Sequence, residues 1–415
     1  MPKPPDNVIR RRRLLAVIAL GVVILGAAAA YLLQRPGDVS NPKAAFTTVP
    51  PVAKPDPPKT VDWPIYGYDR ARTKWFRTRS DLEPPYARQW SYRGKKLLEF
   101  PPVLDDSGLY LLDDGGVIRK LSKLNGKKIW GHRLGTLAAS SPALDGEGRV
   151  FAVTLLQTPN SGHGNVTAMN ARSGRILWRR ALPSRAESSP LVSGQLVIFG
   201  TEDGTVFALN RRTGRTVWTF SASGAVKGGL ALSGGRLFFG DYGGEVHAIR
   251  LSDGKQIWSA SPGGTFYSTA AVAWGRVYIG NTDGRLYSYT TSGDLAWARQ
   301  TGAYVYASPA VADLSGVGPT VYAGSYSGTF FAWDARTGDV RWSYDAGGKI
   351  SGGAFVIGDL VWFDDLGNER TVALGARTGR KVFTMETGAF NPLVTDGQTL
   401  FIVGYADMYG FKPRR

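Results

Sequence analysis

The chain has 415 residues, and its 53 glycines, 18 tyrosines, 18 phenylalanines and 12 tryptophans favour short strands joined by tight turns. It contains no cysteine, which excludes disulfide bonds, thiolate metal sites and a cysteine nucleophile. The formal net charge of +17 indicates a basic surface that attracts anionic partners, but most Arg and Lys residues stand singly in turns, so we expect no nucleic-acid partner.

An uncharged apolar run lies close to the N-terminus, at residues 14–33. Twenty helical residues at 1.5 Å each just cross a hydrocarbon core of about 30 Å. The basic tail at residues 1–13 should stay in the cytoplasm, which places everything from Gln34 onward outside the plasma membrane. A cleaved signal peptide is the alternative, because residues 27–30 are all alanine. The apolar residues that follow favour an uncleaved, single-pass signal anchor.

Residues 34–61 contain seven prolines and few large apolar side chains. Such a composition favours an extended, semi-rigid linker. We expect it to hold a domain formed by residues 62–415 away from the bilayer.

A repeat of about forty residues runs through that domain. Its mark is a glycine followed four positions later by an aromatic residue, and successive aromatics lie 39 to 48 residues apart. The repeats are Gly126–Trp130, Gly174–Trp178, Gly214–Trp218, Gly254–Trp258, Gly293–Trp297, Gly338–Trp342 and Gly379–Phe383.

Each repeat has room for four short antiparallel strands, as residues 187–220 show best. Their expected strands, 188–192, 195–200, 205–210 and 215–220, are separated by tight turns. Tandem four-stranded units of this kind predict the blades of a β-propeller.

The two ends of the repeat region are complementary. The last unit, residues 391–412, holds only three expected strands, whereas the segment around Trp90 carries an aromatic without a unit of its own. We expect residues 88–92 to supply the missing strand, which would close the ring and remove its free edges. The predicted fold is therefore all-β, an eight-bladed propeller of four-stranded antiparallel blades, preceded by one transmembrane helix.

The repeat at Val206–Trp218 resembles that of pyrroloquinoline-quinone (PQQ) propeller proteins, and 330–342 and 166–178 match it too. Residues 62–69 are similar to the start of the catalytic domain in quinoprotein dehydrogenases. This resemblance covers about 62–412 and implies a quinoprotein-like, eight-bladed fold. Non-catalytic relatives share the repeat, among them BamB-type assembly lipoproteins and sensor domains of membrane kinases. The nearest resemblance is to membrane-anchored proteins of actinobacteria.

Quinoprotein alcohol dehydrogenases typically stack PQQ against a ring formed by two adjacent cysteines, and they hold Ca²⁺ with a Glu and an Asn beside a catalytic Asp. This chain has no cysteine and no segment onto which those roles can be transferred, so we assign no catalytic residue and no metal ligand. We expect a binding or scaffold protein of the cell envelope. Its partner would be an envelope protein or an anionic cell-wall or lipid component. A dehydrogenase of alcohols or sugars that uses PQQ and Ca²⁺ is the alternative, and a hydrolase on the same scaffold is a third.

Alignment of the repeats places one residue of each unit just before its innermost strand. These residues should ring one mouth of the central channel, where carboxylates, an ammonium group and phenols could bind a polar or aromatic ligand. The alternative is that they only pack and solvate the mouth. The candidate residues are Glu99, Glu187, Lys227, Tyr267, Tyr306 and Ser351.

Two other features invite a functional interpretation. Three aspartate pairs, at 105–106, 113–114 and 364–365, are expected in turns, where aspartate stabilises the backbone. We therefore interpret them as structural and not as acid–base pairs or Ca²⁺ ligands. An insertion at residues 155–165 lengthens the second blade and could either contact a partner or be neutral.

Overall fold

The computed structural model describes residues 37–47, 62–78 and 82–414. The chain forms two compact units, residues 1–39 and 40–415. The predicted membrane span at residues 14–33 lies outside the described residues. Among those that are described, no helix is both long and apolar enough to cross a bilayer.

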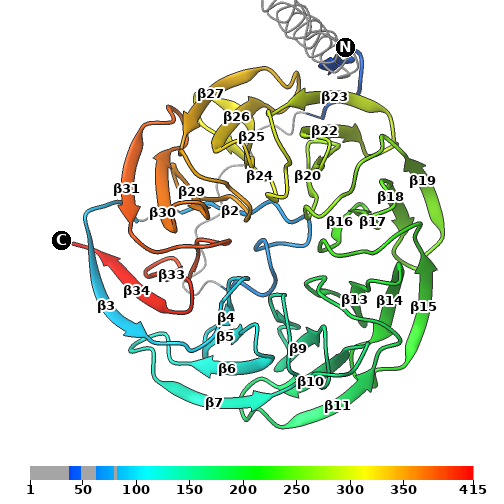
Figure 1. Ribbon diagram of the computed structural model, residues 1–415, viewed down its shortest axis with the longest axis vertical. Helices are drawn as coiled ribbons and strands as arrows, with labels where there is room; N and C mark the ends of the chain where they lie inside the picture. The colour runs from blue at the N-terminus through cyan, green and yellow to red at the C-terminus, as the bar shows by residue number, and fades with distance from the viewer. Residues whose placement is uncertain (1–36, 48–61, 79–81, 415) are drawn as a thin grey trace, which may run out of the picture. The chain divides into compact units, whose positions relative to one another are not determined.

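The second unit is a ring of eight antiparallel sheets, which confirms the predicted propeller (Figure 1). The first four blades are β4 (Val103–Asp105), β5 (Gly108–Leu112), β6 (Val117–Leu121) and β7 (Lys128–Arg133); β8 (Ala143–Leu144), β9 (Arg149–Thr154), β10 (Asn165–Asn170) and β11 (Ile176–Ala181); β12 (Leu191–Ser193), β13 (Leu196–Gly200), β14 (Thr205–Asn210) and β15 (Thr216–Ser221); and β16 (Ala231–Ser233), β17 (Arg236–Gly240), β18 (Val246–Arg250) and β19 (Gln256–Ala260).

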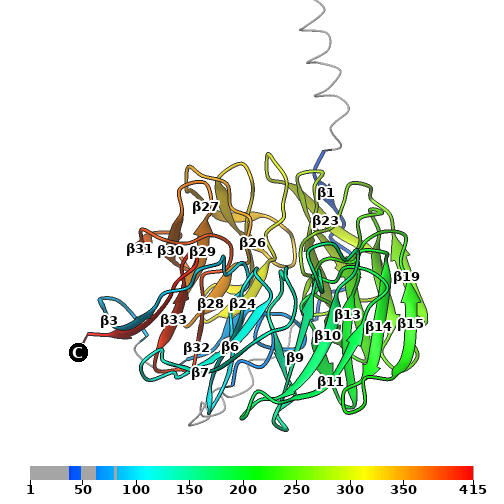
Figure 2. The same cartoon turned by 60° about the horizontal axis from the view of Figure 1, so that its bottom comes forward.

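The other four blades are β20 (Ala271–Ala273), β21 (Arg276–Gly280), β22 (Arg285–Thr290) and β23 (Leu295–Gln300); β24 (Ala310–Leu314), β25 (Gly318–Gly324), β26 (Thr329–Asp334) and β27 (Val340–Asp345); β28 (Phe355–Ile357), β29 (Leu360–Asp365), β30 (Arg370–Gly375) and β31 (Lys381–Met385); and β32 (Leu393–Thr395), β33 (Leu400–Val403), β34 (Met408–Pro413) and β3 (Tyr86–Tyr92). Two further short strands are β1 (Val39–Ser40) and β2 (Trp75–Phe76), and β2 pairs with β28. Figure 2 shows this ring from the side.

The repeated glycine and aromatic residue lock neighbouring blades together. Trp218 of β15 lies against Gly254 of the next blade so closely that a Cβ there would come within 2.5 Å of the ring. The indole N–H of Trp218 also donates to the Leu251 carbonyl oxygen at 3.0 Å. Glycine is therefore required for this approach as well as for its φ of +70°. Equivalent contacts join Trp90 to Gly126, Trp130 to Gly174, Trp178 to Gly214, Trp258 to Gly293, Trp297 to Gly338 and Trp342 to Gly379.

The ring closes as predicted, with the N-terminal strand β3 completing the C-terminal blade. β3 pairs antiparallel with β34, and Trp90 lies opposite Gly410. The Trp90 indole N–H donates to the Lys123 carbonyl oxygen of blade 1 at 2.9 Å. One strand thus joins the last blade to the first.

The innermost strands are shorter than predicted. In blade 3 the strand begins at Leu191, and not at Ser188 as expected. The two serines bond neighbouring blades instead: Ser188 Oγ donates to the Gly228 carbonyl oxygen at 2.9 Å, and Ser189 Oγ accepts from the Ser141 N–H at 3.0 Å. The sheets converge close to the axis. Small polar residues there form hydrogen bonds to the neighbouring blade and are not part of a strand of their own sheet.

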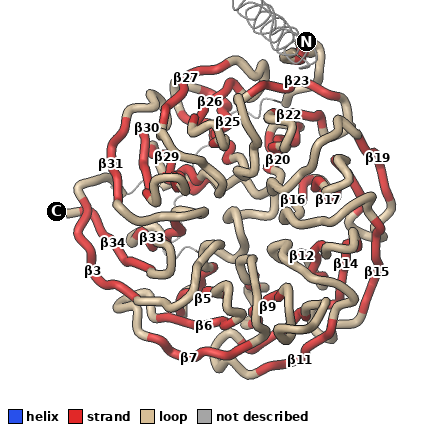
Figure 3. Tube along the Cα trace, viewed as in Figure 1, coloured by secondary structure: helices blue, strands red, loops and turns tan. Residues whose placement is uncertain are grey.

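The sequence did not predict that residues 63–76 would run around the axis (Figure 1, blue trace at the centre). Their backbone oxygens accept hydrogen bonds of 2.7–2.9 Å from innermost strands of six blades, and Arg70 Nε reaches blade 3. Figure 3 shows this central part as loop. The six donor–acceptor pairs are Leu104–Trp63, Leu144–Pro64, Leu232–Arg70, Val272–Ala71, Val311–Thr73 and Val356–Lys74.

Two cations of this axial segment are fully buried. Arg72 donates to the carbonyl oxygens of Leu230 (2.9 Å), Ser189 (3.0 Å) and Pro190 (3.2 Å), and also to that of Tyr66. Lys74 Nζ donates to the Arg72 and Pro309 carbonyl oxygens at 3.1 and 3.0 Å. Burial lowers the pKa of Arg72 to about 10 and that of Lys74 well below its usual value. Both side chains therefore tie the innermost strands together through backbone oxygens.

Candidate functional site

The predicted ring residues gather at one mouth of the channel, above the axial segment. A cavity of about 30 Å³ lies there, and five of the six candidates line it. The sixth, Glu187, is 7% exposed and its Oε1 lies 2.8 Å from Lys227 Nζ. The five lining candidates are Glu99, Lys227, Tyr267, Tyr306 and Ser351. The structure thus brings all six together, and their role in binding stays a prediction.

One half of the mouth, with carboxyl groups from blades 1 and 3, is acidic. Lys227 Nζ lies between Glu187 Oε1 and Glu202 Oε1, at 2.8 and 3.0 Å. Burial alone would lower the pKa of Lys227, but the two carboxylates raise it, so the ammonium group stays charged. We call Glu99, Glu187, Glu202 and Asp114 the acidic half.

Glu99, in the acidic half, titrates near neutral pH. Burial raises its pKa to about 7, and the negative charges of Glu187 and Asp114 add to the shift. The Tyr267 O–H donates to Glu99 Oε1 across 3.5 Å, and Lys227 opposes the shift. A ligand that brings a charge to this carboxyl would therefore change its protonation.

The opposite half, contributed by blades 4 to 6, is aromatic. Ring centroids are 6.2 Å apart for Tyr242 and Tyr267, 5.5 Å for Tyr267 and Tyr306, and 4.9 Å for Tyr306 and Tyr326. Tyr304 extends the row and is 51% exposed. The tilted and edge-to-face arrangement is favourable for aromatic pairs. We call these five residues the tyrosine arc.

Three residues of the tyrosine arc were missed in the sequence. Tyr242 and Tyr326 occupy the turn between the second and third strands of their blades, at the position of Glu202 in blade 3. Alignment of these turns would have revealed a second ring of residues beside the first. Tyr304 stands two residues before the predicted Tyr306, and no repeat pattern marks it.

The mouth does not fit PQQ and Ca²⁺. A cavity of about 30 Å³ holds one or two water molecules, whereas sites for small molecules and cofactors measure roughly 300–1,000 Å³. Within residues 37–47, 62–78 and 82–414, no three His, Asp or Glu side chains are grouped so as to hold a metal ion. We therefore derive no chemical step through either group.

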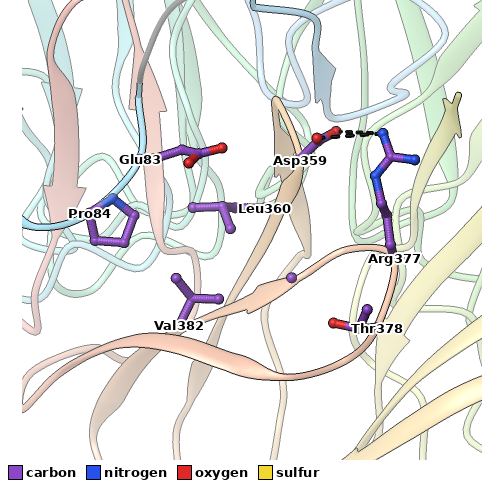
Figure 4. Close-up of a pocket in the computed structure, with 8 residues that line it drawn as sticks. Glu83, Pro84, Asp359, Leu360, Arg377, Thr378 and Val382 are labelled. Carbon is purple, nitrogen blue, oxygen red and sulfur yellow. Dashed lines mark hydrogen bonds and ion pairs between the residues drawn. The ribbon is translucent and has the colours of Figure 1, made fainter.

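A larger cavity of about 280 Å³ lies at the outer edge of blade 7 (Figure 4). Pro84, Leu360 and Val382 form much of its wall. Two of its three charged side chains engage each other, because Arg377 Nη2 lies 3.3 Å from Asp359 Oδ1, and Arg377 Nη1 donates to the Ser315 carbonyl oxygen. The mouth of the channel is the better candidate, since several blades contribute polar groups to it.

The insertion in blade 2 forms a compact turn. Its ends are tied down by hydrogen bonds from Leu155 N–H to the Leu137 carbonyl oxygen, at 2.9 Å, and from Gln157 N–H to that of His163, at 3.1 Å. Residues 158–160 at its tip are exposed. These contacts do not distinguish between an insertion that binds a partner and a neutral insertion.

The expectation that all three aspartate pairs lie in turns is wrong for residues 364–365. Both side chains are 1% exposed and are the last two residues of β29, where they pair with β30. Asp364 Oδ1 is 2.7 Å from Thr371 Oγ1, which is itself 2.9 Å from the Thr387 carbonyl oxygen. The Thr371 hydroxyl is placed to donate to either of these oxygens, and the Ala389 N–H donates to Asp364 Oδ2 at 3.1 Å. Burial nevertheless raises the pKa of Asp364 to about 7, and the charge of Asp365 adds to the shift, whereas the two hydrogen bonds oppose it.

Asp364→Asn is expected to make the protein more stable than the wild type above pH 7. In the native state Asp364 keeps its proton up to about pH 7, but in the unfolded chain it loses the proton near pH 3.8. Its contribution to the free energy of unfolding therefore decreases as the pH rises between these two values, by roughly 1.4 kcal/mol for each unit of pKa difference. Asparagine does not titrate, so the variant does not lose this stability. Urea unfolding at pH 4.5 and 8 would measure the difference. A difference that is constant with pH would contradict a protonated Asp364.

Comparisons with known proteins agree with this architecture. A model of the family described as outer membrane protein assembly factor BamB matches residues 114–227 and 202–412. BamB from Moraxella catarrhalis is 20% identical, with a TM-score of 0.63 over 80% of this chain and 99% of that one. The quinohemoprotein alcohol dehydrogenase of Comamonas testosteroni is 15% identical, with a TM-score of 0.69 over 86% and 81%.

A second quinohemoprotein alcohol dehydrogenase, from Pseudomonas putida HK5, is 14% identical, with a TM-score of 0.71 over 85% of this chain and 80% of that one. No curated protein sequence matches the chain. At these identities the likeness to solved structures shows the fold alone. Since enzymes and an assembly factor share that fold, function has to be argued from the site.

Proposed function

Because the chain belongs to the family of the outer membrane protein assembly factor BamB, we propose that it is a binding or scaffold protein of the cell envelope. The observation that carries this proposal is the tyrosine arc beside the acidic half, at the mouth of a channel too narrow for a cofactor. Tyrosine is enriched where proteins bind one another, because its ring supplies contact area and its hydroxyl a hydrogen bond.

The proposed partner is an envelope protein. The carboxyl groups of the acidic half add negative charge to one side of the mouth, and Lys227, Lys96 and Arg185 offset part of it. The mouth therefore offers an anionic wall polymer or lipid headgroup less attraction than the basic chain as a whole does. A polypeptide can instead place apolar side chains on the tyrosine arc and polar or basic groups against the acidic half. The proposed location is the outer side of the plasma membrane, with residues 14–33 as a single-pass anchor, as in the membrane-anchored actinobacterial proteins that the repeats resemble.

Combined replacement Tyr304→Ala, Tyr306→Ala and Tyr326→Ala should weaken capture of the partner at least tenfold, or about 1.4 kcal/mol. The full chain in detergent would be used to capture proteins from envelope extract, and the affinity of the captured protein measured for each variant. A matched control replaces three exposed apolar residues elsewhere, Leu124, Val217 and Val340, with alanine.

Two results would contradict the proposal. Equal affinity of the tyrosine variant and the wild type would remove the mouth as the binding surface. Saturable dye-linked oxidation of an alcohol or sugar after addition of PQQ and Ca²⁺ would establish a dehydrogenase instead.

A further inference from the structure

Residues 40–47, part of the predicted linker, pack on blade 5. Asn41 N–H donates to the Ala296 carbonyl oxygen of β23 at 2.7 Å, and Thr47 N–H donates to that of Trp274 at 3.0 Å. The Phe46 ring stacks on the Trp274 indole, with centroids 6.1 Å apart and planes inclined by 27°. We call residues 40–47 the strap and the surface of blade 5 beneath it the seat.

The seat offers donors that the strap carbonyls satisfy. Arg276 is 1% exposed and donates through Nη2 to the Ala44 carbonyl oxygen at 2.8 Å, and through Nε to that of Ala45. Its guanidinium also lies 5.6 Å from the Phe46 ring centroid. Arg299, which is 9% exposed at its side chain, donates through Nη2 to Ser40 Oγ at 2.7 Å. Two largely buried guanidinium groups thus donate hydrogen bonds to oxygen atoms of the strap.

The backbone conformation of Trp274 is the clearest evidence that the seat is adapted to bind the strap. It is the first residue of the two-residue turn between β20 and β21, with a φ of +52°. At the same position three other blades use glycine, with φ between +54° and +58°. A left-handed conformation strains a bulky residue, and such strain persists where the side chain serves a purpose. The glycines are Gly194, Gly234 and Gly358.

We infer that blade 5 carries a docking site for an extended peptide, that its occupant is the strap of the same chain, and that the strap stays docked in solution. The stacked ring of Phe46, the amides of Asn41 and Thr47, and the donors of Arg276 and Arg299 hold it there.

Trp274→Gly tests the seat, because glycine suits the turn and only the indole is lost. Hydrogen exchange of the full chain in lipid nanodiscs should show Asn41 and Thr47 amides protected in the wild type. In the variant they should exchange at least about tenfold faster, with no loss in the unfolding midpoint of the ring. Tyr405→Ala, which removes another half-exposed aromatic ring, serves as the control and should leave the strap protected.

Two results would overturn the docking site. One is that the strap amides are unprotected in the wild type. The other is that they exchange equally slowly in the wild type and in Trp274→Gly.

Discussion

Deletion of residues 408–415 is expected to abolish the cooperative unfolding transition of the propeller. β34 joins β33 to β3, so without it blade 8 is reduced to two short strands and β3 loses the strand with which it pairs. Trp90 also loses the surface of Gly410. An open ring exposes unpaired edges on both sides of the gap, and such edges promote association. Circular dichroism during urea unfolding, with size-exclusion chromatography, would measure both effects.

The control for this deletion lacks only residues 414–415. It loses one described hydrogen bond, from Arg414 N–H to the Pro85 carbonyl oxygen at 2.8 Å, and should unfold close to the wild type. The full deletion removes a whole strand, and the total stability of a domain is only about 5–15 kcal/mol. A single cooperative transition at the wild-type midpoint after that deletion would show that the ring tolerates a gap.

Replacement Arg72→Met is expected to cost about 3 kcal/mol or more in the free energy of unfolding. It would leave four buried carbonyl oxygens, on the axial segment and blades 3 and 4, without their donor. The lowered pKa of Arg72 shows that its burial has a cost, which offsets part of the loss. Urea midpoints at constant pH would measure the change.

Lys74→Met is the matched comparison and should cost clearly less. Among the residues that the structure describes, Lys74 donates to two carbonyl oxygens, and its strongly lowered pKa indicates that its charge is held at a high desolvation cost. Removing that buried charge is favourable, and this gain offsets much of the free energy of unfolding that is lost with the two hydrogen bonds. Equal effects of the two substitutions would contradict the argument that Arg72 contributes more because it donates to more carbonyl oxygens.

Several features of the propeller could be predicted from the sequence because they depend on short periods. A glycine followed four positions later by an aromatic residue recurs in seven units, and the turns between strands recur with it, so the number of blades and strands could be predicted. Closure by the segment around Trp90 followed from counting strands at the two ends. Even the mouth residues could be aligned, since each stands at the same place in its repeat.

The features that distinguish one blade from the next were decided only by the tertiary structure. Residues 63–76 bond to seven blades, and the strap lies on blade 5, yet neither contact repeats along the chain. The tyrosine arc joins turns from three blades, whose nearness depends on how the sheets converge at the axis. A periodic pattern specifies each unit and its neighbour, because blades pack mainly on adjacent blades. Contacts between a unique segment and many blades exist only once the ring has closed, and these contacts shape the mouth and the seat.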